Sequence, residues 1–205
     1  MALHLIPLAR PVARLIALLA LLLLVYACGE TGSGNIVTET RDVGSFSRIE
    51  ASAGVNVDLV VDAGRQPGVS VTYDDNLLDR VATQVEGDTL VIKHSGSIRL
   101  LGDGRFVTVV VADIEGIGAS SGSNITGSGA TESYSVGASS GANVDLRALT
   151  AARVEVDASS GANVNVSASD SVRADASSGA NVDIYGNPAD VSADESSGAN
   201  IDVRG

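Results

Sequence analysis

The sequence predicts an all-β protein built as a parallel β-helix, a solenoid of stacked coils, and three observations lead to this fold class. A hexapeptide of the form Ser-Ser-Gly-x-Asn-Val or Ser-Ser-Gly-x-Asn-Ile occurs five times at intervals of 18 to 20 residues, and a fixed period of this size is typical of solenoids. Between the hexapeptides apolar and polar residues alternate, which is the pattern of strands with one buried face. Aromatic residues make up only 3% of the chain, so the core must consist of small and branched aliphatic residues.

The N-terminal residues 1–27 have the features of a secretory signal peptide. Two arginines precede an unbroken apolar run, Leu15–Ala27, which is shorter than the roughly 20 residues of a membrane-spanning helix but suits the apolar region of a signal peptide. Val25-Tyr26-Ala27 before Cys28, the single cysteine, resembles the lipobox of bacterial lipoproteins. This resemblance implies cleavage before Cys28 and lipidation of Cys28. An ordinary signal peptide with an incidental cysteine and an uncleaved anchor are the alternatives.

A flexible tether is expected at 28–35, followed by one domain over 36–205 whose first part, 36–113, is wider and less regular. Residues 51–59 look like a degenerate copy of the repeat, Asp75–Asp79 is expected to form a turn or one helical turn, and Gly87-Asp88 predicts a hairpin with antiparallel strands. The strand candidates are Val69–Tyr73, Val81–Val85, Leu90–Lys93 and Phe106–Val111.

The second part, 114–205, consists of the repeats of about 19 residues. The five hexapeptides start at Ser120, Ser139, Ser159, Ser177 and Ser196. Two or three short strands per repeat, stacked on the next repeat at the inter-strand distance of about 4.8 Å, form a parallel β-helix. The Ser-Ser-Gly sequence suits a tight corner, because Gly accepts positive φ angles and the hydroxyl groups can bond the turn backbone.

Stacking of identical residues predicts ladders along the solenoid axis. The asparagines of the hexapeptides should hydrogen-bond to one another; they are Asn124, Asn143, Asn163, Asn181 and Asn200. The alternation also predicts two interior columns, one of Val144, Val164, Val182 and Ile201 and one of Val154, Val172 and Val191.

Three stretches of the sequence carry a family resemblance. They are Ser45-Phe46-Ser47-Arg48-Ile49, the run from Asp75-Asn76-Leu77-Leu78 to Gly87-Asp88-Thr89-Leu90-Val91-Ile92, and the Ser-Gly-x-Asn repeats. Together they resemble the bacterial putative auto-transporter adhesin head GIN domain family over roughly residues 36–205. The resemblance implies a right-handed β-helix on an exported, often lipid-anchored protein, and the family name implies adhesion. The family brings no established catalytic or ligand residues.

Composition limits the function classes. The net charge of −12 argues against nucleic acid as a partner, and a single Cys excludes an internal disulfide and a Cys-based zinc site. β-Helix enzymes that act on polysaccharides need clustered carboxylates and aromatic platforms, but the chain has no Trp. His94 is interpreted as a solvated residue at a strand end. We therefore expect no catalytic residues, and a degenerate carbohydrate-active enzyme is the third-ranked hypothesis.

Two acidic columns are expected on the outer face of the repeats. Asp157, Asp175 and Asp194 form the first, and Asp145, Asn165, Asp183 and Asp202 form the second. Carboxylates about 5 Å apart repel each other, and a divalent cation relieves the repulsion; the first column is thus a candidate Ca²⁺ site of a calcium-stabilised surface adhesin. The alternative is a solvated acidic face in which Arg173 neutralises its neighbours. No other cofactor is expected.

The prediction for function is an exported, lipid-anchored protein with a non-catalytic binding, adhesion or envelope-structural role. The membrane is contacted through the lipidated N-terminus, and a glycan or a protein is the expected ligand of the Ser- and Asn-rich corners, which otherwise serve only as scaffold. Gly29 after Cys28 resembles outer-membrane sorting, which places the protein at the outer membrane or cell surface if the cell has two membranes.

The last repeat carries a charge that the others lack. The residue before each Ser-Ser pair is alanine in four repeats but Glu195 in the fifth. If this column faces inward, Glu195 blocks stacking of a further coil on the free edge, with Arg204 adding charge to the terminal strand; a corner that tolerates any residue is the alternative. We expect a monomer.

Overall fold

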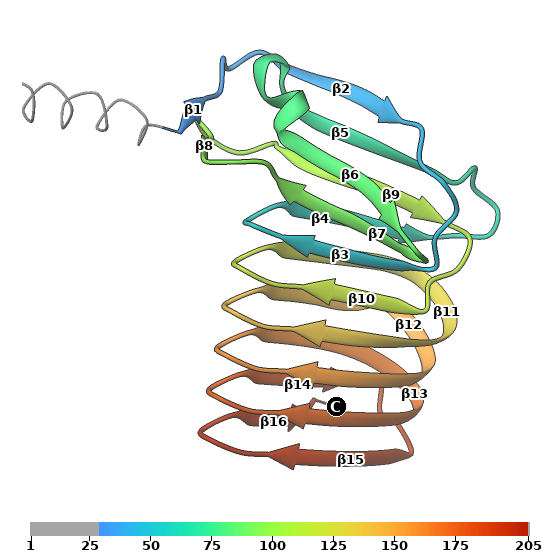
Figure 1. Cartoon of the computed structure of the whole chain (residues 1–205). Helices are drawn as coiled ribbons and strands as arrows, with labels where there is room; N and C mark the ends of the chain where they lie inside the picture. Colours follow the sequence, from blue (N-terminus) through green and yellow to red (C-terminus); the bar gives the residue numbers. More distant parts are fainter. Residues whose placement is uncertain (1–28, 205) are drawn as a thin grey trace, which may run out of the picture.

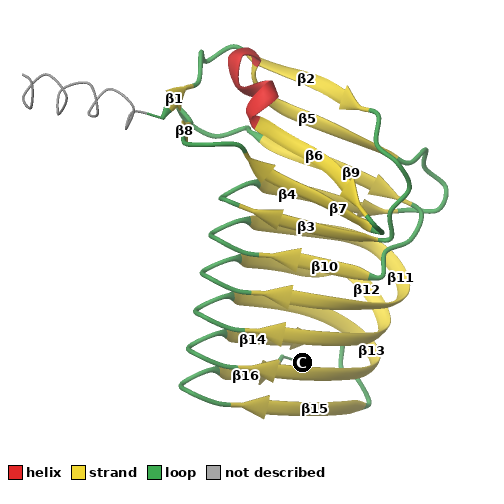
Figure 2. Ribbon diagram, in the orientation of Figure 1, coloured by secondary structure: helices red, strands yellow, loops and turns green. Residues whose placement is uncertain are grey.

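The computed structural model describes residues 29–204, and this part of the chain is all-β with one short 3-10 helix. A mixed sheet of 14 strands makes up nearly the whole molecule, and a separate pair of short strands lies beside its first turns. Figure 2 shows strands running across the molecule at every level, joined by short turns on one side. Within the described residues no helix has the length and apolar character needed to cross a membrane.

The repeats form stacked parallel turns, as the sequence predicts (Figure 1). Every pairing among these strands is parallel and keeps equivalent residues opposite each other. The strands are β10 (Gly116–Ala119), β11 (Asn124–Ala138), β12 (Asn143–Ala158), β13 (Asn163–Ala176), β14 (Asn181–Tyr185), β15 (Asp190–Glu195) and β16 (Asn200–Val203). The middle turns are thus single long strands that bend, where we expected two or three short strands each, and register shifts mark the bends.

Each corner is a two-residue turn in which a serine and a glycine both have positive φ. In the third repeat Ser160 has φ 51° and Gly161 has φ 71°, and Ala162 N–H donates to the Ser159 carbonyl at 3.1 Å. A Cβ on Gly161 would meet no atom within 4 Å, so its φ angle, and not lack of space, requires glycine here. The sequence predicted the role of this glycine but not the left-handed serine, a conformation that non-glycine residues adopt uncommonly.

The interior columns are those expected from the alternation. Val144, Val164 and Val182 lie in register and are at most 1% exposed, with Ile201 next in the column on the last turn. Val154, Val172 and Val191 form the second column. The core is mainly aliphatic, and the two buried tyrosines, Tyr73 and Tyr134, are its largest side chains. Because each turn buries its valines against its neighbours, the turns stabilise one another.

The first part of the domain mixes parallel and antiparallel pairs. A degenerate first turn, β3 (Arg48–Ser52) and β4 (Asn56–Val61), stacks in parallel on β10 and β11. Beyond it, β6 (Val81–Glu86) and β7 (Thr89–His94) form the predicted hairpin, and β2 (Ile36–Arg41) and β9 (Phe106–Val111) flank β5 (Gly68–Asp74) as antiparallel partners. The 3-10 helix η1 (Asp75–Arg80) occupies the expected helical turn.

The segment at 29–35 is docked on the domain, so the prediction of a flexible tether is wrong for these residues. β1 (Glu30–Thr31) pairs in parallel with β8 (Ile98–Arg99). Gly34 N–H donates to the Asp74 carboxylate at 2.7 Å, and Asn35 donates to Asp75 at 2.9 Å. A Gly- and Ser-rich composition also occurs where backbone packs closely against other residues. Gly32 is such a case, because a Cβ on it would lie only 2.5 Å from Asp74 Cγ.

Candidate functional site

The asparagines of the corners form a continuous side-chain ladder on the outside of the stack. Each amide nitrogen donates to the side-chain oxygen of the preceding turn, at 2.9 Å for Asn143 to Asn124, 3.0 Å for Asn163 to Asn143 and 3.2 Å for Asn181 to Asn163. Asn200 lies in register with Asn181 at the end of the row. All five asparagines that the sequence singled out are exposed.

The ladder extends one turn further than the hexapeptides predict. Asn124 donates to Asn56 at 2.8 Å, and Asn56 donates to the Arg105 carbonyl oxygen at 3.1 Å. The preserved Gly-x-Asn-Val spacing of the degenerate repeat, Gly54 to Val57, carries this signal in the sequence. Asn124, Asn143 and Asn163 each donate one N–H to one neighbour and accept one hydrogen bond from the other, so each keeps a second N–H and a second oxygen lone pair for another partner. We call this row, Asn56 to Asn200 with the adjoining Ser-Ser-Gly corners, the asparagine ridge.

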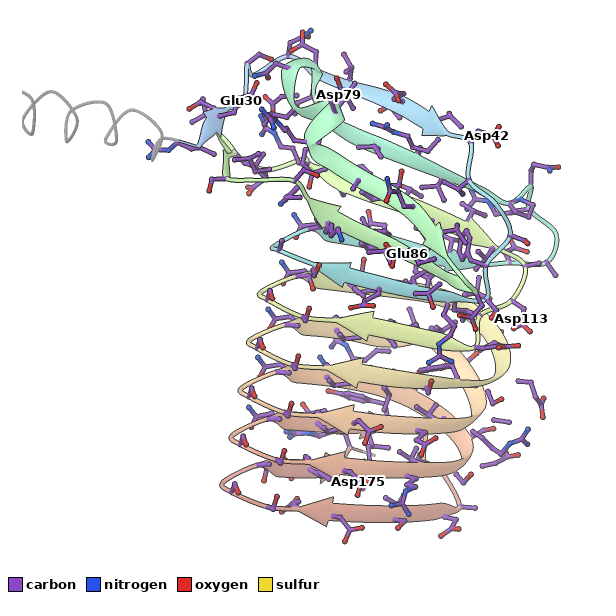
Figure 3. All side chains as sticks on the ribbon, in the orientation of Figure 1. Glu30, Asp42, Asp79, Glu86, Asp113 and Asp175 are labelled. Atoms are coloured by element: carbon purple, nitrogen blue, oxygen red, sulfur yellow. The ribbon has the colours of Figure 1, made fainter. Side chains whose placement is uncertain are left out.

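The first acidic column borders a groove near the C-terminal end of the stack. Asp157, Asp175 and Asp194 lie opposite one another on successive strands, and they line a groove of about 480 Å³ together with Glu195 and the serines of the corners. Figure 3 shows Asp175 among the side chains of the last turns. Arg173 approaches Asp175 at 3.2 Å, as in the solvated-face alternative. Over residues 29–204 no three acidic, histidine or cysteine side chains are grouped so that they could hold a metal ion.

Arginines pair with much of the second acidic column. Arg147 forms a two-pronged contact with Asp145, with Nε at 2.8 Å, and its hydrogen bonds lower the pKa of that carboxyl. At the other end Arg204 donates to Asp183 at 2.9 Å and contacts Asp202 at 3.0 Å. Asn165 interrupts the row of carboxylates between these pairs. The second acidic column is therefore partly neutralised by two arginines.

Glu195 differs from the alanines of its column in position as well as charge. The four alanines are buried, at 4% exposure each, whereas Glu195 is exposed. Its carboxylate accepts a hydrogen bond of 2.6 Å from the Ile201 backbone N–H. Ile201 lies on β16, which among the described strands pairs only with β14 and forms an edge of the sheet. Glu195 therefore caps a free donor on the sheet edge.

His94 is not the solvated residue expected from its place at a strand end. The imidazole is half-buried, with Nδ1 2.8 Å from the Ala53 carbonyl oxygen and Nε2 2.9 Å from the Tyr73 hydroxyl. Because a carbonyl only accepts, Nδ1 carries the proton and Nε2 accepts from the tyrosine. Burial lowers the pKa of His94, which favours this neutral form. The residue ties the first corner to β5 and leaves no free nitrogen for chemistry.

A buried ion pair that the sequence analysis missed organises the N-terminal end. Arg105 donates to the two oxygens of Asp74 at 2.8 and 2.9 Å, and both side chains are almost inaccessible, at 3% and 0%. These hydrogen bonds lower the pKa of Asp74 to about 2 although burial opposes the shift. Gly102 and Gly104, both at positive φ, mark a tight loop in the sequence, but no pattern pairs Arg105 with Asp74. Cys28, the predicted lipidation site, lies outside the described residues.

The comparisons with known proteins identify the family. The model described as "putative auto-transporter adhesin, head GIN domain" matches residues 45–127 and 98–188. The chain belongs to this GIN-domain family. Membership indicates a non-catalytic binding role and a surface or exported location. No curated protein matches the sequence.

Several solved structures of putative adhesins match this GIN domain. One from Bacteroides fragilis superimposes with a TM-score of 0.54 at 14% identity, covering 86% of this chain and 100% of its own. One from Parabacteroides merdae gives 0.42 at 12% identity, with 87% and 100% covered, and a putative cell adhesion protein from Clostridium sporogenes gives 0.35 at 10%, with 82% and 98% covered. At 14% identity the likeness to the Bacteroides fragilis structure concerns the fold alone.

Proposed function

We propose that this GIN-domain protein is an exported, lipid-anchored, right-handed parallel β-helix that binds a repeating polymer, such as a glycan, along its asparagine ridge. The parallel, in-register turns support the β-helix assignment. The signal-peptide pattern of residues 1–27 and the lipobox-like residues before Cys28 support export and lipid anchoring. The domain acts as a monomer without catalysis.

The observation that carries the binding proposal is the exposed ladder of identical amides. Each turn presents one asparagine with an unused N–H and an unused oxygen lone pair, at the strand spacing of about 4.8 Å. A polymer with a matching repeat meets the same donor and acceptor on every turn, so weak contacts add along the chain. The ladder bonds between neighbouring amides hold these groups in place before a ligand arrives, which lowers the entropic cost of binding.

A glycan array probed with the full chain tests this function, with two asparagine variants as a matched pair. Asn163→Ala removes one member of the ridge, while Asn165→Ala removes an amide two residues further along the same strand, outside the ridge. We expect the wild type and Asn165→Ala to bind the same glycans and Asn163→Ala to bind them more weakly. Absence of any bound glycan, or equal loss in both variants, contradicts the proposal.

Calcium stabilisation is the second candidate, and it rests on the in-register carboxylates of Asp157, Asp175 and Asp194 beside the groove, which are not grouped as a preformed metal site and would have to converge on the ion. A bound Ca²⁺ would neutralise like charges that the fold brings together on successive strands. Calorimetric titration of Ca²⁺ into the protein decides the matter. Heat of binding together with a raised melting temperature would support a calcium-stabilised adhesin. If Ca²⁺ produces no heat of binding and no rise in melting temperature, the calcium hypothesis is wrong.

A further inference from the structure

The docked N-terminal segment fixes where the chain enters the domain. Glu30 N–H donates to the Ser97 carbonyl and Gly32 N–H to the Arg99 carbonyl, both at 3.0 Å. Gly29 lies so close to the same loop that a Cβ on it would be 2.8 Å from the Ser97 oxygen. A lipid on Cys28 would join the chain one residue before Gly29. The anchor would therefore hold the domain by this face, with no free linker between them.

Exposed apolar side chains gather beside this entry point. Among residues 29–204 only three large hydrophobic side chains are exposed: Leu101 at 55%, Ile36 at 42% and Val203 at 55%. Leu101 is in the loop that follows β8, and Ile36 Cδ1 lies 3.7 Å from where a Cβ on Gly104 of that loop would be. Val203 is on the last turn, far from β1 and β8 (Figure 1).

The loop that carries Leu101 is held in place by the buried ion pair. Arg105 Nη1 donates to the carbonyl oxygens of Leu101 at 2.7 Å and Asp103 at 2.8 Å, while its other nitrogens bind Asp74. Asp74 in turn accepts from Gly34 N–H, so one pair fixes both the loop and the entering segment. Leu101 is thus exposed on an ordered support. Single exposed apolar side chains are ordinary on a protein surface, and Leu101 matters here because it lies beside the point where the chain enters the domain.

Two carboxylates at or near this face are paired with arginines. Glu30 binds Arg80 at 2.9 Å, and the nearby Asp74 is neutralised by Arg105. In 114–205 twelve acidic side chains stand against four basic ones, and in 29–113 thirteen stand against seven, so anionic lipid would repel both parts. The place where the chain enters the domain, and not a difference in net charge, therefore favours the N-terminal end as the part nearest a bilayer.

We call the surface formed by β1, β8, Ile36 and the loop Leu100–Arg105 the anchor face. We infer that the anchor face lies against the lipid bilayer and that the Leu101 side chain inserts into it. This inference rests on the proposed lipid anchor at Cys28. The acyl chains would supply the affinity, since two lipid chains hold a protein stably on a membrane. The anchor face sets the orientation, with the first turn next to the lipid and the last turn furthest from it.

A single tryptophan reports this orientation, because the chain has none of its own. Leu101→Trp is compared with Val203→Trp, whose native side chain has the same 55% exposure at the opposite end. Each full, lipidated chain is placed on phosphatidylcholine vesicles with brominated acyl chains, which quench tryptophan only within the bilayer. On binding to the vesicles, the fluorescence maximum of the Leu101→Trp variant should shift to shorter wavelength and most of its emission should be quenched. The Val203→Trp variant should keep the same emission maximum and the same intensity.

Flotation of the same samples separates the two claims. If the chains float with the vesicles but Leu101→Trp is not quenched, or both tryptophans are quenched alike, the anchor-face inference is wrong and the lipid anchor stands. If chains carrying intact Cys28 do not float, the lipid anchor fails and the inference falls with it. Circular dichroism spectra matching the wild type confirm that each variant is folded.

Discussion

Removing one amide from the middle of the asparagine ridge should lower the stability of the whole stack. Asn163 takes part in two ladder bonds, as donor to Asn143 at 3.0 Å and as acceptor from Asn181 at 3.2 Å. A hydrogen bond contributes about 0.5–1.5 kcal/mol net, and the exposed position favours the lower end of this range. We therefore expect Asn163→Ala to reduce the free energy of unfolding by about 1–2 kcal/mol.

Urea unfolding followed by circular dichroism measures this loss. Asn165→Ala is the control, because Asn165 lies on the same strand with its side chain outside the ladder, and it should change the free energy by less than about 0.5 kcal/mol. The slope of free energy against urea should stay constant in both variants, since neither alters the surface exposed on unfolding. Equal losses in the two variants, or none in Asn163→Ala, would refute the claim that the ladder bonds stabilise the stack.

Three further perturbations probe the core, the free edge and the buried ion pair. Val164→Asp places a carboxylate where the native side chain is 1% exposed, so we expect thermal melts to show a loss above about 4 kcal/mol; a wild-type melting temperature contradicts the register of the core. Glu195→Ala frees the Ile201 N–H and should cause self-association that rises with concentration in light scattering; a dimeric wild type or a monomeric variant would count against the edge-cap interpretation. Asp74, with its pKa lowered to about 2, stabilises the fold above pH 4, and this contribution should fade as pH drops from about 4 to 2. Asp74→Asn should cost roughly 3–5 kcal/mol at pH 7 by leaving Arg105 unpaired and should flatten the stability profile in that pH window, which melts at several pH values will show.

The repeats were predictable because one physical rule applies to every turn. The alternation fixes which side chains face inward, and the fixed spacing then places Val144, Val164 and Val182 in one column, as the structure has them. The same stacking rule predicted the ladder from Asn124 onward. What it did not reveal is that each turn is a single bent strand, because the bends depend on local register shifts between neighbouring turns.

The N-terminal end was less predictable because its contacts join residues far apart in the chain. Asp74 meets Arg105 across 31 positions and Gly34 across 40, and no periodic pattern links them. Composition misled the interpretation of 29–35, since Gly and Ser are frequent both in flexible linkers and where backbone packs closely. His94 shows the same limit, because its partners, the buried Tyr73 and the exposed Ala53, come from another strand and from a turn.

The measurement that tests the central claim most directly is affinity as a function of ligand length. A glycan that binds on the array is prepared as fragments of increasing length, and the dissociation constant for the full chain is measured for each. A ridge of identical amides predicts that affinity rises with each added unit until the fragment spans the row from Asn56 to Asn200, and then levels off. The same affinity for a single unit and for long fragments would mean that ligand binds at one local pocket, and would contradict binding along the ridge.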